Sequence, residues 1–295
     1  MKGLSISFGR KVFLFLDYVF LTVLAFLCLS PMIHVLALSF SSSNAAMAGY
    51  VKFWPVQFTM AAYEFVASRP AFLKSLLIAF ERIAIGVPVN MLLTILIAYP
   101  LSRNVQSFRY RKFFAWFFVI TILFNGGLIP WYITIYKTGL IDSIWSLVLP
   151  GAVPVFNVII LLNFFKGLPD EIAEAAFVDG AGHWTILWKI YVPLSMPAIA
   201  TLVLFCVVGH WNSWFDGLIL MNNPTHYPLQ SYLQTVIVSH DLTVFSPSDY
   251  AKFAEVSDRT SKAAQIFLGA LPVLAVYPFL QRYFMTGIVL GSVKG

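Results

Sequence analysis

The feature that most constrains this chain is a series of long apolar runs, the first of which extends from about Val12 to Phe40. A bilayer core about 30 Å thick needs about 20 apolar residues per helix, and only helices or closed barrels satisfy their backbone hydrogen bonds inside it. Charged residues make up only 11% of the chain, which agrees with a protein that lies mostly in lipid. We therefore predict an all-α, polytopic membrane protein with six transmembrane helices, at about residues 12–38, 72–101, 113–135, 143–165, 197–221 and 263–286.

The first apolar run is expected to remain in the mature protein as a membrane span. Lys2, Arg10 and Lys11 precede it, and the string AMA at 46–48 resembles a signal-peptide cleavage site. The apolar region of a secretory signal peptide is only about 7–15 residues long, however, and this run is about twice that length.

The positive charges indicate the orientation of the spans. With both termini placed in the cytoplasm, the cytoplasmic side holds more Lys and Arg than the outer side, as the positive-inside rule requires. The clearest loop is RNVQSFRYRK at 103–112, which carries four basic residues. Two loops are long, namely 166–197 on the cytoplasmic side and 222–262 on the outer side. The whole of 1–295 is expected to form a single transmembrane domain, with no internal repeat and no soluble domain.

Several function classes are excluded by what the chain lacks. The net charge of +6 is placed beside the spans, which argues against a nucleic-acid partner. Cys28 and Cys206 lie inside apolar runs, so neither a disulfide nor a metal cluster is expected. The five histidines show no metalloenzyme spacing, and no G-x-x-x-x-G-K-[ST] loop is present. The chain is therefore not expected to be an enzyme or to bind a cofactor itself.

The cytoplasmic loop at 166–197 is too polar to insert into lipid and too regular to be unstructured. Pro169 needs no N–H in a first helical turn, and Asp170 and Glu171 are favoured there by the helix dipole, so a short helix should run to about Val178. Small residues give this helix a surface that another backbone can approach closely, and Glu174 lies among them; the small residues are Ala173, Ala175 and Ala176.

A turn and a second helix should follow this short helix. Gly180 and Gly182 allow the turn, and HWTILWKIYVPL at 183–194 then continues as a helix. Trp184, Ile186 and Ile190 of this helix are expected to face apolar neighbours. Pro193 and Pro197 are expected to end it at the next span. The residues alone leave open whether this hairpin docks a partner or merely joins two spans at the membrane surface.

A resemblance favours docking. Eight residues in EAAFVDGAGHWTILWKIYVP resemble the EAA loop of ATP-binding-cassette (ABC) importer permeases, with one difference at Leu187, where the family commonly has Phe. In that family the loop is a coupling helix that docks in a cleft of the ATPase subunit. The resemblance thus implies an ATPase-coupling role for Glu174, Ala175, Ala176, Asp179, Gly180, Ala181, Ile190 and Pro193.

The resemblance extends over nearly the whole chain. The strings NGGLIPWYITIYKTGLIDSIWSLVLP, GHWNSWFDGLILM and YPFLQRYFMTGIVLGSVKG resemble the MalG-like carbohydrate permeases, especially the LplC and YtcP type. This implies a type I ABC importer permease (MetI-like) fold in the bacterial cytoplasmic membrane. It also implies a second homologous permease, two ATPase subunits that bind ATP and Mg, an extracytoplasmic sugar-binding protein, and an oligosaccharide substrate that is acidic in some members.

The string GHWNSWFDG at 209–217 suggests a substrate pathway. Aromatic faces can stack on sugar rings, and amide and carboxylate oxygens can accept hydrogen bonds from hydroxyl groups. Packing of these aromatics against the second permease is the alternative. The candidate pathway residues are His210, Trp211, Asn212, Trp214, Asp216 and, in FNGGLIP at 124–130, Asn125.

A secondary, ion-coupled transporter is the alternative function, because such carriers use buried ionisable groups. Glu81 and Arg82 lie within the second span, although charges near the ends of spans usually snorkel or pair with neighbours. A carrier of this kind is expected to show internal repeats, and none is present. Glycines and prolines inside spans, as in FNGGLIP and in LPGAVP at 149–154, either bend the helices in the ordinary way or shape a pathway.

The end of the chain has two interpretations. One is that residues 287–295 are a frayed terminus, which is the usual state of chain ends. The other, which the resemblance implies, is that they reach between the two ATPases.

Overall fold

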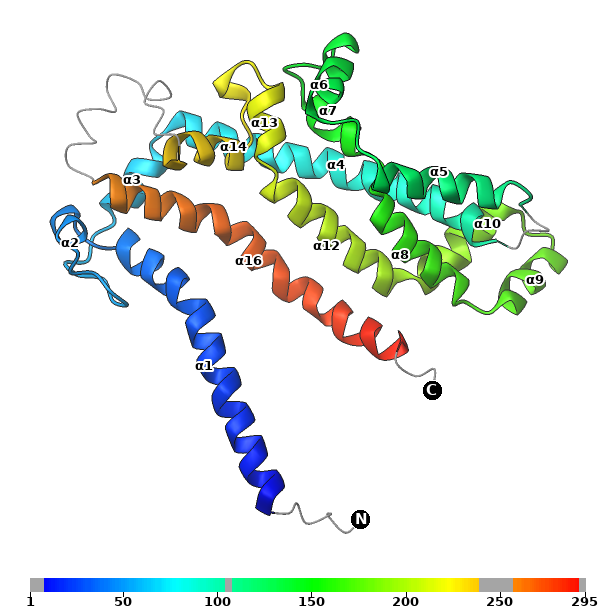
Figure 1. Cartoon of the computed structure of the whole chain (residues 1–295), viewed down its shortest axis with the longest axis horizontal. Coiled ribbons are helices and arrows are strands. Elements are labelled where there is room, and N and C mark those ends of the chain that lie inside the picture. The colour runs from blue at the N-terminus through cyan, green and yellow to red at the C-terminus, as the bar shows by residue number, and fades with distance from the viewer. Residues whose placement is uncertain (1–7, 104–107, 239–256, 292–295) are drawn as a thin grey trace. The chain divides into compact units, whose positions relative to one another are not determined.

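The computed structural model describes residues 8–103, 108–238 and 257–291, and all the regular structure in these ranges is helical (Figure 1), which confirms the all-α prediction. The prediction about the tail falls partly on residues 292–295, and the outer loop 222–262 includes 239–256; both of these stretches lie outside the described ranges. The chain forms two compact units, one of Met1–Pro70 and His240–Ala270, the other of Ala71–Ser239 and Leu271–Gly295.

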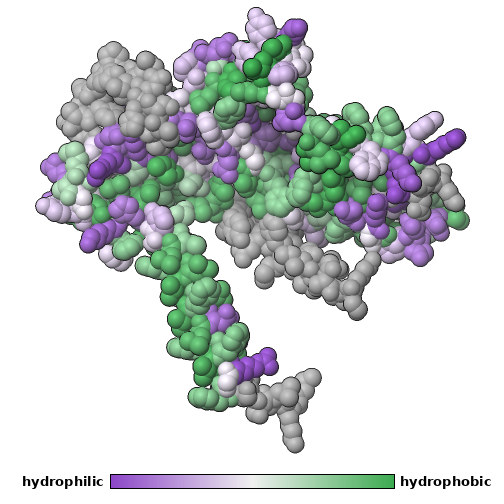
Figure 2. All heavy atoms as spheres, in the orientation of Figure 1, coloured by the Kyte–Doolittle hydropathy of each residue, from purple (hydrophilic) through white to green (hydrophobic). Residues whose placement is uncertain are grey.

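The first unit contains α1 (Phe8–Ser39), α2 (Ser43–Met47), α3 (Ala61–Ala67) and the beginning of α16 (Asp258–Gly291). α1 continues through Pro31, and its most apolar stretch is not buried by the protein. Figure 2 shows apolar side chains along almost the whole of this helix, which suits a helix that lies in lipid. A small core of Ala37, Ala45 and Val51 joins its C-terminal end to the loop that follows.

The second unit is built on α4 (Pro70–Ser102), against which α8 (Val155–Lys166) and α12 (Met196–Asn212) pack. α5 (Arg111–Leu123) packs against α8 in turn. The main core lies between these helices and extends from the middle of α4 toward its C-terminal end. Its largest members are Met91, Ile95, Tyr99, Leu161, Phe165, Ile186, Leu187, Tyr191 and Leu202.

A group of shorter helices forms a second core at the other end of this unit. It comprises α6 (Leu128–Lys137), α7 (Ile144–Val148) and α13 (Phe215–Leu220), which lie together in Figure 1. Ile135, Leu147, Leu220 and Met221 are buried between them. Short helices follow at η3 (Pro224–His226), α14 (Leu229–Leu233) and η4 (Gln234–Val238).

Two of the described helices, α1 and α4, are long and apolar enough to cross a membrane, and there are five candidates if each of three bent pairs makes one crossing. The bent pairs are α5 with α6 (114°), α7 and η1 (Leu149–Gly151) with α8 (47°), and the segment His183–Leu194 with α12 (82°). The predicted span 263–286 falls within α16. The total of six spans stays a prediction.

The glycines and prolines of FNGGLIP and LPGAVP lie at helix breaks, as a shaped pathway requires, whereas Pro31, Pro88 and Pro100 lie inside continuous helices. Gly127 has a φ of +86°, a conformation that is costly for other residues, and it starts α6 in a new direction. Pro150 lies in the single 3₁₀ turn that separates α7 from α8. α5 alone, with 13 residues, is about 20 Å long, which is shorter than the bilayer core.

Candidate functional site

A cavity of about 440 Å³ lies inside the second unit, beside the breaks between α7 and α8 and between α12 and α13. α12 supplies four of its lining residues, the segment of α7 and η1 (Leu149–Gly151) supplies another four, and α6 supplies one tryptophan. The side chains and backbone that line it are those of Arg82, Asn90, Trp131, Ser146, Leu147, Pro150, Gly151, Pro154, Asn157, Phe205, Cys206, Gly209, His210, Ser213 and Asp216.

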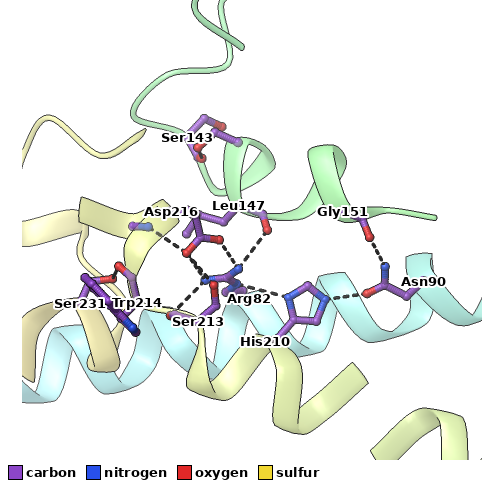
Figure 3. A network of polar contacts seen from close by, with 12 residues as sticks. Arg82, Asn90, Ser143, Leu147, Gly151, His210, Ser213, Trp214, Asp216 and Ser231 are labelled. Atoms are coloured by element: carbon purple, nitrogen blue, oxygen red, sulfur yellow. Dashed lines mark hydrogen bonds and ion pairs between the residues drawn. The ribbon is translucent and has the colours of Figure 1, made fainter. Parts of the chain in front are cut away.

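Arg82 is the centre of a polar network at this cavity (Figure 3), although only 3% of the residue is exposed. Its guanidinium forms a two-pronged ion pair with Asp216, of which the contact from Nη1 to Oδ1 is 3.2 Å. The remaining donors reach the carbonyl oxygens of Leu147 (3.3 Å) and Ser213 (3.5 Å) and Nδ1 of His210 (3.3 Å). All five N–H groups of an arginine are therefore used.

His210 is held in one neutral form by its two neighbours. A guanidinium has no acceptor, so Nδ1 of His210 must accept the hydrogen bond from Arg82 and cannot carry a proton. The proton lies on Nε2, which donates to Oδ1 of Asn90 at 2.6 Å. The amide nitrogen of Asn90 in turn donates to the carbonyls of Gly151 (2.8 Å) and Ala152 (3.0 Å).

The network compensates for the two helix breaks. Where a helix is broken inside a membrane, its freed carbonyl groups need donors from neighbouring elements. Arg82 and Asn90, both on α4, supply these donors to Leu147, Gly151 and Ala152 at one break and to Ser213 at the other. Asp216 also accepts from the hydroxyl of Ser213 at 2.8 Å. The cavity walls are thus fixed by a charged group whose bonds are all made within the chain.

The structure brings together only two of the six predicted pathway residues, His210 and Asp216. Trp211 is buried and packs against Phe80 at 5.5 Å, and Asn212 and Trp214 are exposed outside this cavity. Asn125 lies elsewhere, in a second cavity, where its Oδ1 accepts from the backbone N–H of Gly127 at 2.8 Å.

Asn90, Asn157 and Trp131 line the cavity but are not among the predicted pathway residues. Asn90 is the one amide side chain of α4, and Asn157 is one of the two in α8; a search for polar residues within the apolar runs would have found both. Arg82 was expected to snorkel or to pair with a neighbour, and the structure shows the pair. No periodicity in the sequence indicates that its partner lies 134 residues further along the chain.

The segment 166–197 forms the two expected helices. α9 covers Asp170–Val178, and its end is a Schellman motif in which Gly180 donates to the carbonyl of Phe177 (3.0 Å) and Ala181 to that of Ala176 (2.9 Å). Gly180 has a φ of +79°, which explains the glycine in the string Asp179-Gly180-Ala181. The expected turn at Gly180 is confirmed.

The second helix consists of α10 (His183–Ile186), one turn of π-helix (η2, Leu187–Tyr191) and α11 (Val192–Leu194). Ile186 is buried and Ile190 packs against the main core, as expected. Trp184 is 63% exposed, and its ring lies 6.3 Å from that of Trp188. The helix ends at Leu194, one residue after Pro193, and Pro197 lies in the first turn of α12, where no N–H is needed.

The small residues of α9 are divided between two faces. Ala173 is buried and Ala176 is half-buried against the chain's own core, whereas Glu174 and Ala175 are exposed. The expectation of one continuous small-residue surface is therefore wrong. The exposed side of the segment instead combines Glu174 with large apolar side chains, namely Ile172, Phe177, Val178, Trp184 and Trp188.

Two curated proteins of Bacillus subtilis (strain 168) are similar to this chain over nearly its full length. The polygalacturonan/rhamnogalacturonan transport system permease protein YtcP is 37% identical, with 97% of this chain and 99% of YtcP covered. Protein LplC is also 37% identical, with 97% and 96% covered. A crystal structure of a bacterial ABC transporter involved in the import of the acidic polysaccharide alginate contains a chain that is 31% identical, with a TM-score of 0.88 and 95% and 99% covered.

The family model of the binding-protein-dependent transport system inner membrane component matches residues 3–289. This match includes both the cavity and the segment 166–197, so both lie in the part of the chain that the family model covers. The chain therefore belongs to the family of inner membrane components of binding-protein-dependent transport systems, the permease subunits of ABC importers.

Proposed function

We propose that this chain is one permease subunit of an ATP-driven ABC importer that carries acidic oligosaccharides. The observation that carries the proposal is the full-length similarity to permeases named for transport of polygalacturonan and rhamnogalacturonan, together with the alginate transporter chain that has a TM-score of 0.88. The shared chemistry of these named substrates is a uronate-containing polysaccharide. Family membership in ABC importers sets aside the ion-coupled alternative.

The proposed assembly contains a second, homologous permease, two ATPase subunits that bind ATP and Mg, and an extracytoplasmic sugar-binding protein. The family description itself names binding-protein dependence and an inner-membrane location. We place both termini and the segment 166–197 in the cytoplasm, because this orientation satisfies the positive-inside rule. In this arrangement the loop between α6 and α7 faces outward.

Coupling to the ATPases is assigned to the exposed face of α9 and α10. Glu174 is a solvent-exposed carboxylate among the exposed apolar side chains Phe177 and Val178, and Val178 is 88% exposed. An apolar patch with one charge is the usual composition of a docking surface. On the inner face, Ala173 and Ile186 belong to the same core as α4 and α8, so a displacement of the segment would be transmitted to those helices.

A deletion in the native host tests the proposed substrate class. Removal of this chain should abolish uptake of oligogalacturonate or oligoalginate and should leave uptake of a neutral sugar with its own carrier unchanged. Expression of the intact chain from a plasmid should restore the uptake. Normal uptake of every acidic oligosaccharide in the deletion strain would contradict the proposed substrate class.

A further inference from the structure

Two cavities of the second unit share a single aromatic side chain, Trp131. The inner cavity is the one of about 440 Å³ beside Arg82, and a second cavity of about 490 Å³ lies along α6. Trp131 and Pro150 line both, so the two spaces adjoin at the indole ring. Both volumes fall in the range of roughly 300–1,000 Å³ that is typical of small-molecule sites.

Trp131 keeps binding capacity that the chain does not use. The residue is half-buried and packs on one side against the core of Ile135 and Leu147. Within the described ranges its indole N–H has no hydrogen-bond acceptor, although buried tryptophans usually find one. Asn157 also lines the inner cavity. Among the described residues, its amide nitrogen donates only to the weak acceptor Sγ of Cys206, at 3.3 Å. Its carbonyl oxygen accepts no hydrogen bond from the described residues.

The charged groups of the inner cavity offer no comparable capacity. Every donor of Arg82 is used within the chain, and the charge of Arg82 is balanced by Asp216. His210 is neutral and bonded at both ring nitrogens. A substrate carboxylate would have to displace Asp216 and leave a buried carboxylate unpaired, which is costly. The unused groups are instead an aromatic ring, an N–H donor and an amide oxygen.

We propose that Trp131 is a stacking platform for a sugar ring that passes between the second cavity, along α6, and the inner cavity. Asn157 would accept a hydrogen bond from a hydroxyl group of the sugar. This inference rests on the proposed function as an oligosaccharide importer. It adds that this subunit contacts the sugar itself, and that it recognises the apolar ring face and the hydroxyl groups rather than the carboxylate. Selection for acidic sugars then belongs to other subunits.

The test uses the complete transporter in proteoliposomes, supplied with sugar-loaded binding protein and ATP. Trp131→Ala should raise the KM for uptake of an oligogalacturonate about tenfold, since the stacking energy of an aromatic ring corresponds to about this factor. Trp131→Phe, which keeps a ring, should stay within about threefold of the wild type. Trp145→Ala is the matched control, because Trp145 is 43% exposed on α7 and lines neither cavity.

A second substrate separates ring recognition from carboxylate recognition. A partly methyl-esterified oligogalacturonate that the wild type also transports should show the same increase in KM with Trp131→Ala. An increase only for the fully acidic substrate would overturn the proposal, as would wild-type kinetics of a correctly assembled Trp131→Ala transporter. Equal loss with Trp131→Phe and Trp131→Ala would also overturn it, because stacking is common to both rings. If the wild type itself transports no acidic oligosaccharide, the proposed function fails instead.

Discussion

Arg82 and Asn90 are polar residues within a membrane helix, and both donate hydrogen bonds to backbone carbonyls at breaks in neighbouring helices. This use explains why a charge is tolerated there. A buried arginine is expensive in an apolar environment unless every donor is satisfied and its charge is compensated. Asp216 provides the compensation, with 18% of its side chain exposed. The ion pair is thus part of the architecture of the cavity.

Removal of one partner of this pair should destabilise the protein strongly. Asp216→Asn leaves Arg82 buried without a counter-charge, and we expect a loss of about 3–5 kcal/mol of unfolding free energy. The double variant Arg82→Leu/Asp216→Leu should lose less than this. Thermal unfolding of the purified protein in detergent measures both. Asp258→Asn is the control and should cost under about 1 kcal/mol, because the pair of Asp258 with Lys262 is at the surface. If the double variant lost the sum of the unfolding free energies that the two single substitutions lose, Arg82 and Asp216 would not act as a pair.

Gly180 and Gly182 provide a matched test of the coupling segment. An added Cβ would have open space at both positions, but only Gly180 has a positive φ, +79°. Gly180→Ser should cost about 1–2 kcal/mol at the end of α9 and change the orientation of this helix. We therefore expect less uptake per ATP hydrolysed, with normal insertion into the membrane. Gly182→Ser should behave as the wild type, since serine is a good helix N-cap. Equal coupling ratios in the two variants would exclude this role for the turn.

At the residue scale, sequence reasoning succeeds where the cause is local. The turn at Gly180 follows from the φ that only glycine adopts readily, and the start of α9 follows from Pro169, Asp170 and Glu171. The polar network around Arg82 has no such local cause. Arg82 meets Asp216 and His210 only because α4 packs beside α12, and no local signal records such packing. Trp211 and Trp214 are predicted pathway residues because aromatic faces can stack on sugar rings, but neither lines the cavity.

At the scale of elements, the loop before α7 and the loop after α13 are joined by the carboxylate of Asp142. Asp142 has a φ of +61° and precedes α7. Its Oδ1 accepts from His226 Nδ1 at 2.9 Å and from the backbone N–H groups of Asn222 (3.2 Å) and Asn223 (3.4 Å). Its own N–H donates to the carbonyl of Leu220 at 2.9 Å. The loop before α7 is therefore tied to the loop that follows α13.

This connection should depend on pH. Partial burial alone would raise the pKa of Asp142, but the hydrogen bonds from His226, Asn223 and Asn222 outweigh it and hold the pKa below its ordinary value. A lowered folded-state pKa means that the stabilisation is present above the ordinary value of about 4 and is lost as the pH falls through the folded-state pKa. Asp142→Asn should therefore be less stable at pH 7, by about 0.5–1.5 kcal/mol.

Unfolding temperatures measured between pH 7 and pH 3 check this expectation. The difference between wild type and Asp142→Asn should shrink as the pH falls below about 4. Asp179→Asn serves as the control, because Asp179 is exposed and accepts no side-chain hydrogen bond from the described residues. A constant difference between wild type and Asp142→Asn over the whole range would show that the carboxylate is not the connecting group.

The helix breaks themselves were only partly predictable. Gly127 and Pro150 indicate the breaks in α5–α6 and α7–α8, because glycine and proline interrupt helices for known conformational reasons. The break at Ser213 and Trp214 contains neither glycine nor proline, and the sequence predicts one continuous span there, 197–221. The carbonyl group of Ser213 accepts its hydrogen bond from Arg82 on α4, and this contact depends on helix packing that the local sequence does not show.

At the scale of the whole molecule, the cavity and the coupling segment are both attached to α4. The same core contains Val87 and Met91 near the cavity and Ala173, Ile186 and Tyr191 in the segment. Figure 1 shows α9 and α10 near one end of α4, whereas α6 and α7 lie over its middle part. Because this core is continuous, a displacement of the docked segment would reach the cavity walls through packed side chains. This connection is the physical basis that we propose for ATP-driven opening of the cavity.

The family and the helical class follow from the sequence because they depend on composition and on one well-spaced string, Glu174 to Pro193, and the full-length match confirms them. The position of the cavity could not be predicted from the sequence, because it depends on the angles between the broken helices. The angle of 114° between α5 and α6, for example, is set by contacts of α6 with α7 and α13.

Uptake by proteoliposomes tests the central claim most directly. The complete transporter, with its second permease, ATPases and binding protein, is reconstituted without any proton or sodium gradient, and labelled oligogalacturonate is supplied with ATP on the ATPase side. We expect uptake that requires both hydrolysable ATP and binding protein, and that ceases when a non-hydrolysable analogue replaces ATP. A second preparation has a proton or sodium gradient but no ATP, and we expect no uptake from it. Uptake driven by the gradient alone would contradict the account, because it would identify an ion-coupled carrier.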